Sequence, residues 1–167
     1  MRYPPLQEAP VPRAGMLAGG RGCLSDSLVL SGRFPASGLL FLCVSNSSRS
    51  QMAEGLARAR LGDRVSVQSA GSHPGTVNLH AVVVLSEIGI DISGHRSKHV
   101  DTIDPAGVGT VITLCAEEVC PAFLGHARRL ARPLPDPAGS GGTEEEQLGR
   151  FRVARDEISS YLDQLAF

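Results

Sequence analysis

The segment from Cys43 to Ser50 has the composition of an oxyanion-binding loop that carries a nucleophilic thiol. It reads Cys-Val-Ser-Asn-Ser-Ser-Arg-Ser and lies between an apolar run and a segment with helical character. Backbone N–H groups at the start of a helix point into a small concavity that favours an anion. Arg49 can close such a site with a planar fork that matches a tetrahedral oxyanion. The same field favours the thiolate of Cys43 over the thiol, which makes Cys43 the candidate nucleophile.

The other residues of this loop have supporting roles in the prediction. The Ser50 hydroxyl can donate a hydrogen bond to the Cys43 thiolate, and Asn46 suits the left-handed backbone of a tight turn. The predicted oxyanion-binding set is Val44, Ser45, Asn46, Ser47, Ser48, Arg49 and Ser50. The alternative is an inert cysteine at a strand end beside a serine-rich helix cap, since cysteines are often buried. The strand, the Cys-to-Arg spacing and the following helix together favour a reactive site.

Two of the three further cysteines bear on the choice between a hydrolase and a reductase. Cys115 ends an apolar run, and Cys120 follows it at a spacing too wide for a Cys-x-x-Cys redox or zinc motif. A phosphatase needs one nucleophilic thiol, whereas a reductase must deliver two electrons and can use a second thiol at the same sheet edge. A disulfide requires Cα atoms within about 7 Å, so the segment that carries Cys120 must be looped. Unrelated structural thiols are the alternative, and Cys23 receives no role.

The elements that must position these groups alternate between strands and helices. Apolar runs predict four strands, over residues 39–44, 65–71 with its turn, 108–114 and 130–134. Helical periodicity predicts three helices, over 51–61, 78–88 and 143–165. This alternation predicts an α/β domain with a four-stranded parallel sheet flanked by helices on both faces. Ligands of such sheets bind outside the carboxyl ends of the strands, where Cys43 and Cys115 both fall.

Composition limits the classes of function that need to be considered. Residues 1–37 are rich in Pro and Gly and lack periodicity, which predicts a poorly ordered extension ahead of one domain over 38–167. The formal charge of −1 and the lack of a basic stripe argue against nucleic-acid binding. No apolar stretch approaches the ~20 residues that span a bilayer, and no signal peptide is evident. We therefore expect a soluble, monomeric protein of the reducing cytoplasm.

From residue 38 to its end, the chain resembles arsenate reductases built on the low-molecular-weight protein tyrosine phosphatase fold. The matching stretches keep the family's order and are 41–43, 50–55, 69–71, 89–93, 113–115, 136–139 and 155–158. The resemblance implies that Cys43 attacks arsenate, that Cys115 attacks the Cys43 sulfur as arsenite departs, and that Cys120 then attacks Cys115. The exposed disulfide that results is reduced by thioredoxin or glutaredoxin. No metal or organic cofactor is expected.

The resemblance also implies a cation-related cluster next to the loop. Some members of the family bind potassium through residues that match Asn46, Glu54 and Ser69, together with an acid. Lys98, the single lysine of the chain, stands at the position of that acid. A lysine ammonium is a compact cation, so we hypothesise that it pairs with Glu54 and replaces the ion. A solvated surface lysine is the alternative. His95 matches a position of structural support.

The nearest alternative is a protein tyrosine phosphatase that hydrolyses phosphate monoesters through a Cys43 phosphoenzyme. Arg49 and Asp136, the residue that matches the family's general acid, would keep the same roles, although Asp-Pro is also a common turn dipeptide. Such phosphatases usually carry tyrosines near the acid, whereas residues 137–142 contain no aromatic side chain. The sequence therefore favours a small inorganic oxyanion, with weak phosphatase activity. A non-catalytic oxyanion sensor is a further alternative, which would show no turnover.

Overall fold

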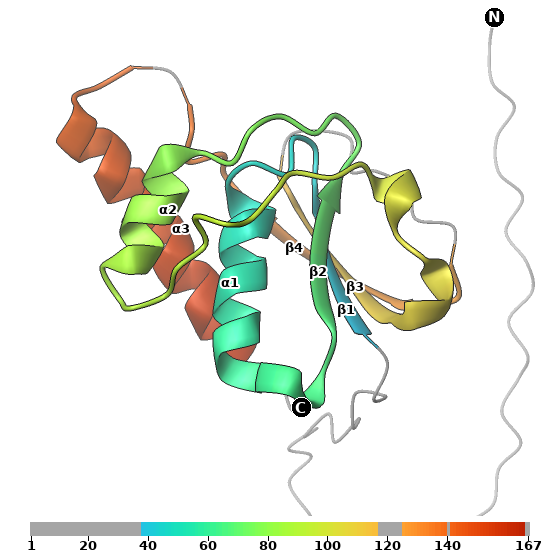
Figure 1. Ribbon diagram of the computed structural model, residues 1–167. Coiled ribbons are helices and arrows are strands. Elements are labelled where there is room, and N and C mark those ends of the chain that lie inside the picture. The colour runs from blue at the N-terminus through green and yellow to red at the C-terminus, as the bar shows by residue number, and fades with distance from the viewer. Residues whose placement is uncertain (1–37, 117–124, 140, 166–167) are drawn as a thin grey trace, which may run out of the picture. The chain divides into compact units, whose positions relative to one another are not determined.

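The computed structural model describes residues 38–116, 125–139 and 141–165, and Figure 1 shows how their elements are arranged. The four strands are β1 (Gly38–Cys43), β2 (Val67–Gly71), β3 (Val108–Cys115) and β4 (Arg128–Leu134). They form one sheet in the order β2-β1-β3-β4, and all neighbouring strands are parallel. The predicted four-stranded parallel sheet is confirmed. The N-terminal extension with Cys23, and Cys120, lie outside the described residues.

Strand β1 is central and buried on both faces because every residue in it is apolar or glycine. Leu39 and Phe41 pack into the larger core cluster together with residues of the three α-helices. Leu40 and Leu42 point to the other face and pack with Val100 and other residues of a smaller cluster. This division follows from the alternation of side chains along a strand.

Three α-helices cover the first of these faces: α1 (Arg49–Leu61), α2 (Leu79–Ser86) and α3 (Glu144–Asp163). The second face is covered by the segment that contains two 3₁₀-helices, η2 (Val100–Thr102) and η3 (Pro105–Gly107). Helices thus flank both faces as expected, but the α-helices all lie on one side. A third 3₁₀-helix, η1 (Gly62–Arg64), follows α1 directly.

The predicted helix caps are present. The Asn78 side chain accepts a hydrogen bond from the His80 N–H at the start of α2. Thr143 and Glu146 form the reciprocal capping box of α3. Helix α2 ends at Ser86, two residues before the predicted end. In the part of the chain that the structure describes, none of the helices is both long and apolar enough to cross a membrane.

Candidate active site

The loop between β1 and α1 is held in place by hydrogen bonds to its carbonyl oxygens. The N–H groups of His73, Gly75 and Asn78 donate to the carbonyls of Val44, Ser45 and Ser47 at 3.0, 2.9 and 2.9 Å. These bonds satisfy three carbonyl acceptors of the loop. The chain after β2 therefore supports the loop from outside, which its sequence did not indicate.

Asn46 is the conformational centre of the loop. It is fully buried and has a φ of 46°, which confirms the predicted left-handed backbone. Its Nδ2 donates to Ser50 Oγ and to Ser69 Oγ, both at 2.8 Å. Its Oδ1 accepts from the backbone N–H of Lys98 at 2.8 Å. One side chain thus ties the loop to α1, to β2 and to the segment after α2.

The candidate nucleophile lies at the carboxyl end of β1 and contacts the start of α1. The Cys43 thiol is buried, and its Sγ lies 2.9 Å from Ser50 Oγ. Ser50 is the second residue of α1, so the sulfur lies near the positive end of the helix dipole. The structure thus contains the predicted contact between Ser50 and Cys43.

Arg49 links the loop to the neighbouring strands and to the candidate acid. Its guanidinium is nearly buried and donates from Nη1 to the carbonyl of Leu134 at 2.9 Å and to that of Leu114 at 3.4 Å. Its Nη2 lies 3.9 Å from Asp136 Oδ2, and the Asp136 side chain is 48% exposed. Arg49 and Asp136 therefore meet at one site, as predicted. The two carbonyl contacts fix the guanidinium at the carboxyl ends of β3 and β4.

A buried carboxylate with two cationic neighbours lies behind the loop. Glu54 Oε2 accepts a hydrogen bond from Ser69 Oγ at 2.5 Å and lies 3.5 Å from Lys98 Nζ. Glu54 Oε1 pairs with Arg58 Nη2 at 2.6 Å, one helical turn away. The pairing of Glu54 with Lys98 is as hypothesised. Arg58 was not among the predicted site residues, although an arginine four residues after an acid in a helix indicates an ion pair.

His95 supports the loop through a second residue that sequence reasoning missed. Its Nδ1 lies 3.0 Å from Gln51 Oε1, and Gln51 Nε2 donates to the carbonyls of Asn46 at 3.0 Å and Arg96 at 3.2 Å. The buried Gln51 amide therefore bridges the loop and the segment after α2. Partial burial holds the pKa of His95 below its usual value, and Arg58 and Lys98 act in the same direction.

The remaining predicted residues lie where the sheet places them. Ser48 is buried, and its Oγ has no hydrogen-bond partner among the described residues. Cys115 ends β3 and pairs in register with Leu134 of β4. Because β3 also neighbours β1 in the parallel sheet, Cys115 and Cys43 end adjacent strands at the same edge.

Comparison with known proteins identifies relatives of this chain. The family described as low molecular weight phosphotyrosine protein phosphatase matches residues 38–166. The arsenate reductase of Bacillus subtilis (strain 168) is 42% identical over 130 residues, which cover 77% of this chain and 94% of that protein. An arsenate reductase solved in a phosphate-binding state has a TM-score of 0.64 at 28% identity, covering 76% of this chain and 94% of that one. A thioredoxin-dependent arsenate reductase of Corynebacterium glutamicum has a TM-score of 0.54 at 28% identity, covering 77% of this chain and 63% of that one.

Proposed function

This chain belongs to the low molecular weight phosphotyrosine protein phosphatase family, and we infer that it reduces arsenate to arsenite with Cys43 as the nucleophile. The observation that carries this inference is the second thiol: Cys115 ends the strand beside the one that Cys43 ends. Hydrolysis of a phosphate ester has no use for a thiol there, whereas reduction can use one to supply the second thiol of a disulfide. The relatives named as arsenate reductases support the same activity.

In the first step, the Cys43 thiolate forms a bond to arsenic, and one arsenate oxygen leaves as water. The backbone N–H groups of the loop and the Arg49 guanidinium bind the remaining oxygens. Asp136 supplies a proton to the leaving oxygen, because water is a far better leaving group than hydroxide. The distance of 3.9 Å between Asp136 Oδ2 and Arg49 Nη2 places the acid beside the oxyanion-binding guanidinium and supports this role. Arsenic remains in oxidation state V in the covalent adduct.

In the second step, the Cys115 thiolate attacks the Cys43 sulfur. A sulfur–sulfur bond forms, and the sulfur–arsenic bond breaks with its electron pair remaining on arsenic, which leaves as arsenite in oxidation state III. Cys120 then attacks Cys115 and releases the Cys43 thiolate. The role of Cys120 rests on the sequence, since this residue is outside the described part of the chain. An external dithiol, thioredoxin or glutaredoxin, reduces the resulting disulfide in the reducing cytoplasm.

We propose that Lys98 takes the place of a potassium ion in the cluster around Glu54. Asn46 Oδ1 accepts from the Lys98 N–H, and Ser69 Oγ donates to Glu54. The ammonium of Lys98 and the guanidinium of Arg58 both pair with the Glu54 carboxylate. A further cation would be repelled by these two charges. We therefore assign the stabilising charge behind the loop to Lys98.

A thioredoxin-coupled assay tests the function. NADPH consumption is measured with arsenate for wild type, Cys43→Ser, Cys115→Ser and Cys120→Ser. We expect sustained turnover for wild type, none for Cys43→Ser and Cys115→Ser, and at most one turnover per protein for Cys120→Ser. Hydrolysis of p-nitrophenyl phosphate is measured in parallel. A wild-type protein that hydrolyses this ester but consumes no NADPH with arsenate would be a phosphatase, and one that binds arsenate without either reaction would be a sensor.

A further inference from the structure

We propose that Arg150 is a positioning residue for Asp136, which it aligns through the backbone of the segment formed by residues 136–139 and 141. This inference rests on the proposed function, because it concerns the residue that protonates the leaving oxygen. Arg150 lies on α3 and takes no part in the loop between β1 and α1.

The Asp136 side chain has little packing to hold it. It is 48% exposed, and its Oδ1 accepts a hydrogen bond from the N–H of Ala138 at 3.2 Å. The carbonyl of Asp136 accepts from the N–H of Gly139 at 3.4 Å, which closes a turn. The orientation of the carboxylate is therefore coupled to the backbone of this turn. Groups that hold this backbone therefore also help to hold the acid, together with its contact to Arg49.

Arg150 binds this backbone at three points. Its Nε donates to the carbonyl of Pro137 at 3.3 Å, and its Nη2 donates to the carbonyls of Gly139 at 3.2 Å and Gly141 at 3.0 Å. A guanidinium can serve three carbonyls at once because its donors form a rigid planar fork. The φ of Gly141 is 92°, a conformation that favours glycine and brings its carbonyl to the same group.

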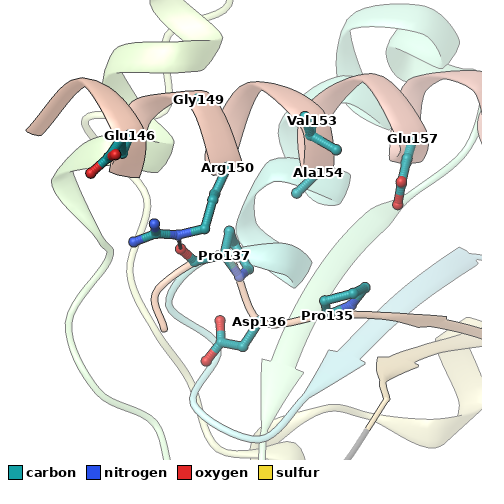
Figure 2. A pocket seen from close by; sticks show the side chains of 9 residues that line it. All are labelled: Pro135, Asp136, Pro137, Glu146, Gly149, Arg150, Val153, Ala154 and Glu157. Carbon is teal, nitrogen blue, oxygen red and sulfur yellow. Dashed lines mark hydrogen bonds between the residues drawn. The ribbon is translucent and has the colours of Figure 1, made fainter. Parts of the chain in front are cut away.

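Side-chain packing between the segment and α3 is incomplete. A cavity of about 510 Å³ lies there, with Pro135 and Pro137 on one side and Gly149, Val153 and Ala154 on the other. In Figure 2 the Arg150 side chain reaches from the helix to Pro137, while the Asp136 carboxylate points away from α3. The three hydrogen bonds of Arg150 connect α3 to the segment beside this cavity.

The consequence concerns one chemical step. Proton delivery to a leaving oxygen depends on the position of the acid, and a displacement of about 1 Å can cost on the order of 10²-fold in rate. Without Arg150 the turn would sample other conformations, and Asp136 would reach the leaving oxygen less often. Steps that need no acid, such as alkylation of Cys43, would proceed as before.

The test is a comparison of variants in single-turnover reduction of arsenate. Arg150→Met removes the three hydrogen bonds, Arg150→Lys keeps the charge without the fork, and Arg152→Met is the matched control. Arg152 is on the same helix and pairs with Glu87 and Glu145, away from the segment. We expect a loss of roughly tenfold or more for Arg150→Met, a smaller loss for Arg150→Lys, and a change within about twofold for Arg152→Met.

Two further measurements separate positioning from a general structural defect. In an Asp136→Asn background, Arg150→Met should cause no additional loss, because both substitutions affect the same acid. Iodoacetamide should alkylate Cys43 of Arg150→Met at the wild-type rate. If reduction by Asp136→Asn is too slow to measure, this alkylation rate is the deciding measurement. An unchanged rate in Arg150→Met, an equal loss in both backgrounds, or slower alkylation would overturn the proposal. A wild-type protein inactive with arsenate would instead refute the proposed function.

Discussion

The Sγ atom of Cys43 and the Oγ atom of Ser50 lie 2.9 Å apart, although seven residues separate them in the chain. The Nδ2 group of Asn46, which can only donate, already contacts the same oxygen at 2.8 Å. The hydroxyl of Ser50 can therefore donate its hydrogen to the sulfur when Cys43 is a thiolate, and this bond would stabilise the charge. Asn46 thus acts on the nucleophile through Ser50.

Replacement of Ser50 by Ala should slow arsenate reduction by roughly 10- to 100-fold, since a hydrogen bond to a charged group contributes about 1.5–3 kcal/mol. Alkylation of Cys43 by iodoacetamide at neutral pH should slow as well, because the thiolate loses a donor. Ser160→Ala is the control, since Ser160 is exposed on α3 and lies outside the loop. Equal rates for Ser50→Ala and wild type in both reactions would show that the contact does not stabilise the thiolate.

Replacement of Lys98 by Gln should make the enzyme respond to potassium. In wild type, the ammonium lies 3.5 Å from Glu54 Oε2, so we expect equal activity in potassium and sodium chloride at matched ionic strength. Lys98→Gln leaves Arg58 as the main partner of the carboxylate and should lower activity in sodium, with partial recovery in potassium. Lys98→Arg keeps the charge and serves as the control. Several-fold activation of wild type by potassium over sodium would contradict the assignment.

The His95 side chain should make folding stability depend on pH. Burial lowers the pKa of His95 in the folded state, while Glu54 and Asp91 act in the opposite direction. The unfolded chain therefore binds the proton more tightly, so the contribution is complete above the ordinary pKa of about 6.5 and is lost as pH falls through the lower folded value. Urea unfolding at several pH values from about 7.5 to 5 should show this loss.

His95→Gln should reduce the slope of the free energy of unfolding against pH in that window, whereas His73→Gln, at an exposed position, should leave it unchanged. Carboxylates titrate mainly below this range and are common to all three proteins. A slope that is the same in wild type and His95→Gln would assign the pH dependence to other groups.

Two glycines should respond to alanine in opposite ways. A Cβ atom at Gly149, within α3, would meet no atom within 4 Å, so Gly149→Ala should raise the free energy of unfolding by about 0.5–1 kcal/mol through helix propensity. A Cβ atom at Gly71 would lie 2.9 Å from the backbone nitrogen of Asn46 and against the carbonyl oxygen of Val44. Gly71→Ala should therefore displace the loop, with losses of both stability and arsenate reduction. Thermal unfolding and the coupled assay measure the two effects, and an active, stable Gly71→Ala protein would contradict this prediction.

Much of the fold could be predicted because its signals are local. The apolar run over 39–43 predicts a strand buried on both faces, and Thr143 with Glu146 predicts the start of α3. The nucleophilic loop was found in the same way, since Cys43, Arg49 and Ser50 lie within eight consecutive residues. The predicted end of α2 was less accurate. Ile88 continues the apolar pattern, although it lies beyond the helix and is about half exposed.

The sequence by itself determined the order of the strands and helices, the reactive loop and the cysteines that can serve it. Only the tertiary structure decided which distant groups hold these parts in place. Arg49 donates to the carbonyl of Leu134, 85 residues away. Arg150 donates to the backbone carbonyls of Pro137, Gly139 and Gly141. The reason is physical: every residue has a carbonyl oxygen, so the residue types in a sequence do not indicate which carbonyl an arginine will bind. Sheet register and helix packing bring that carbonyl into place.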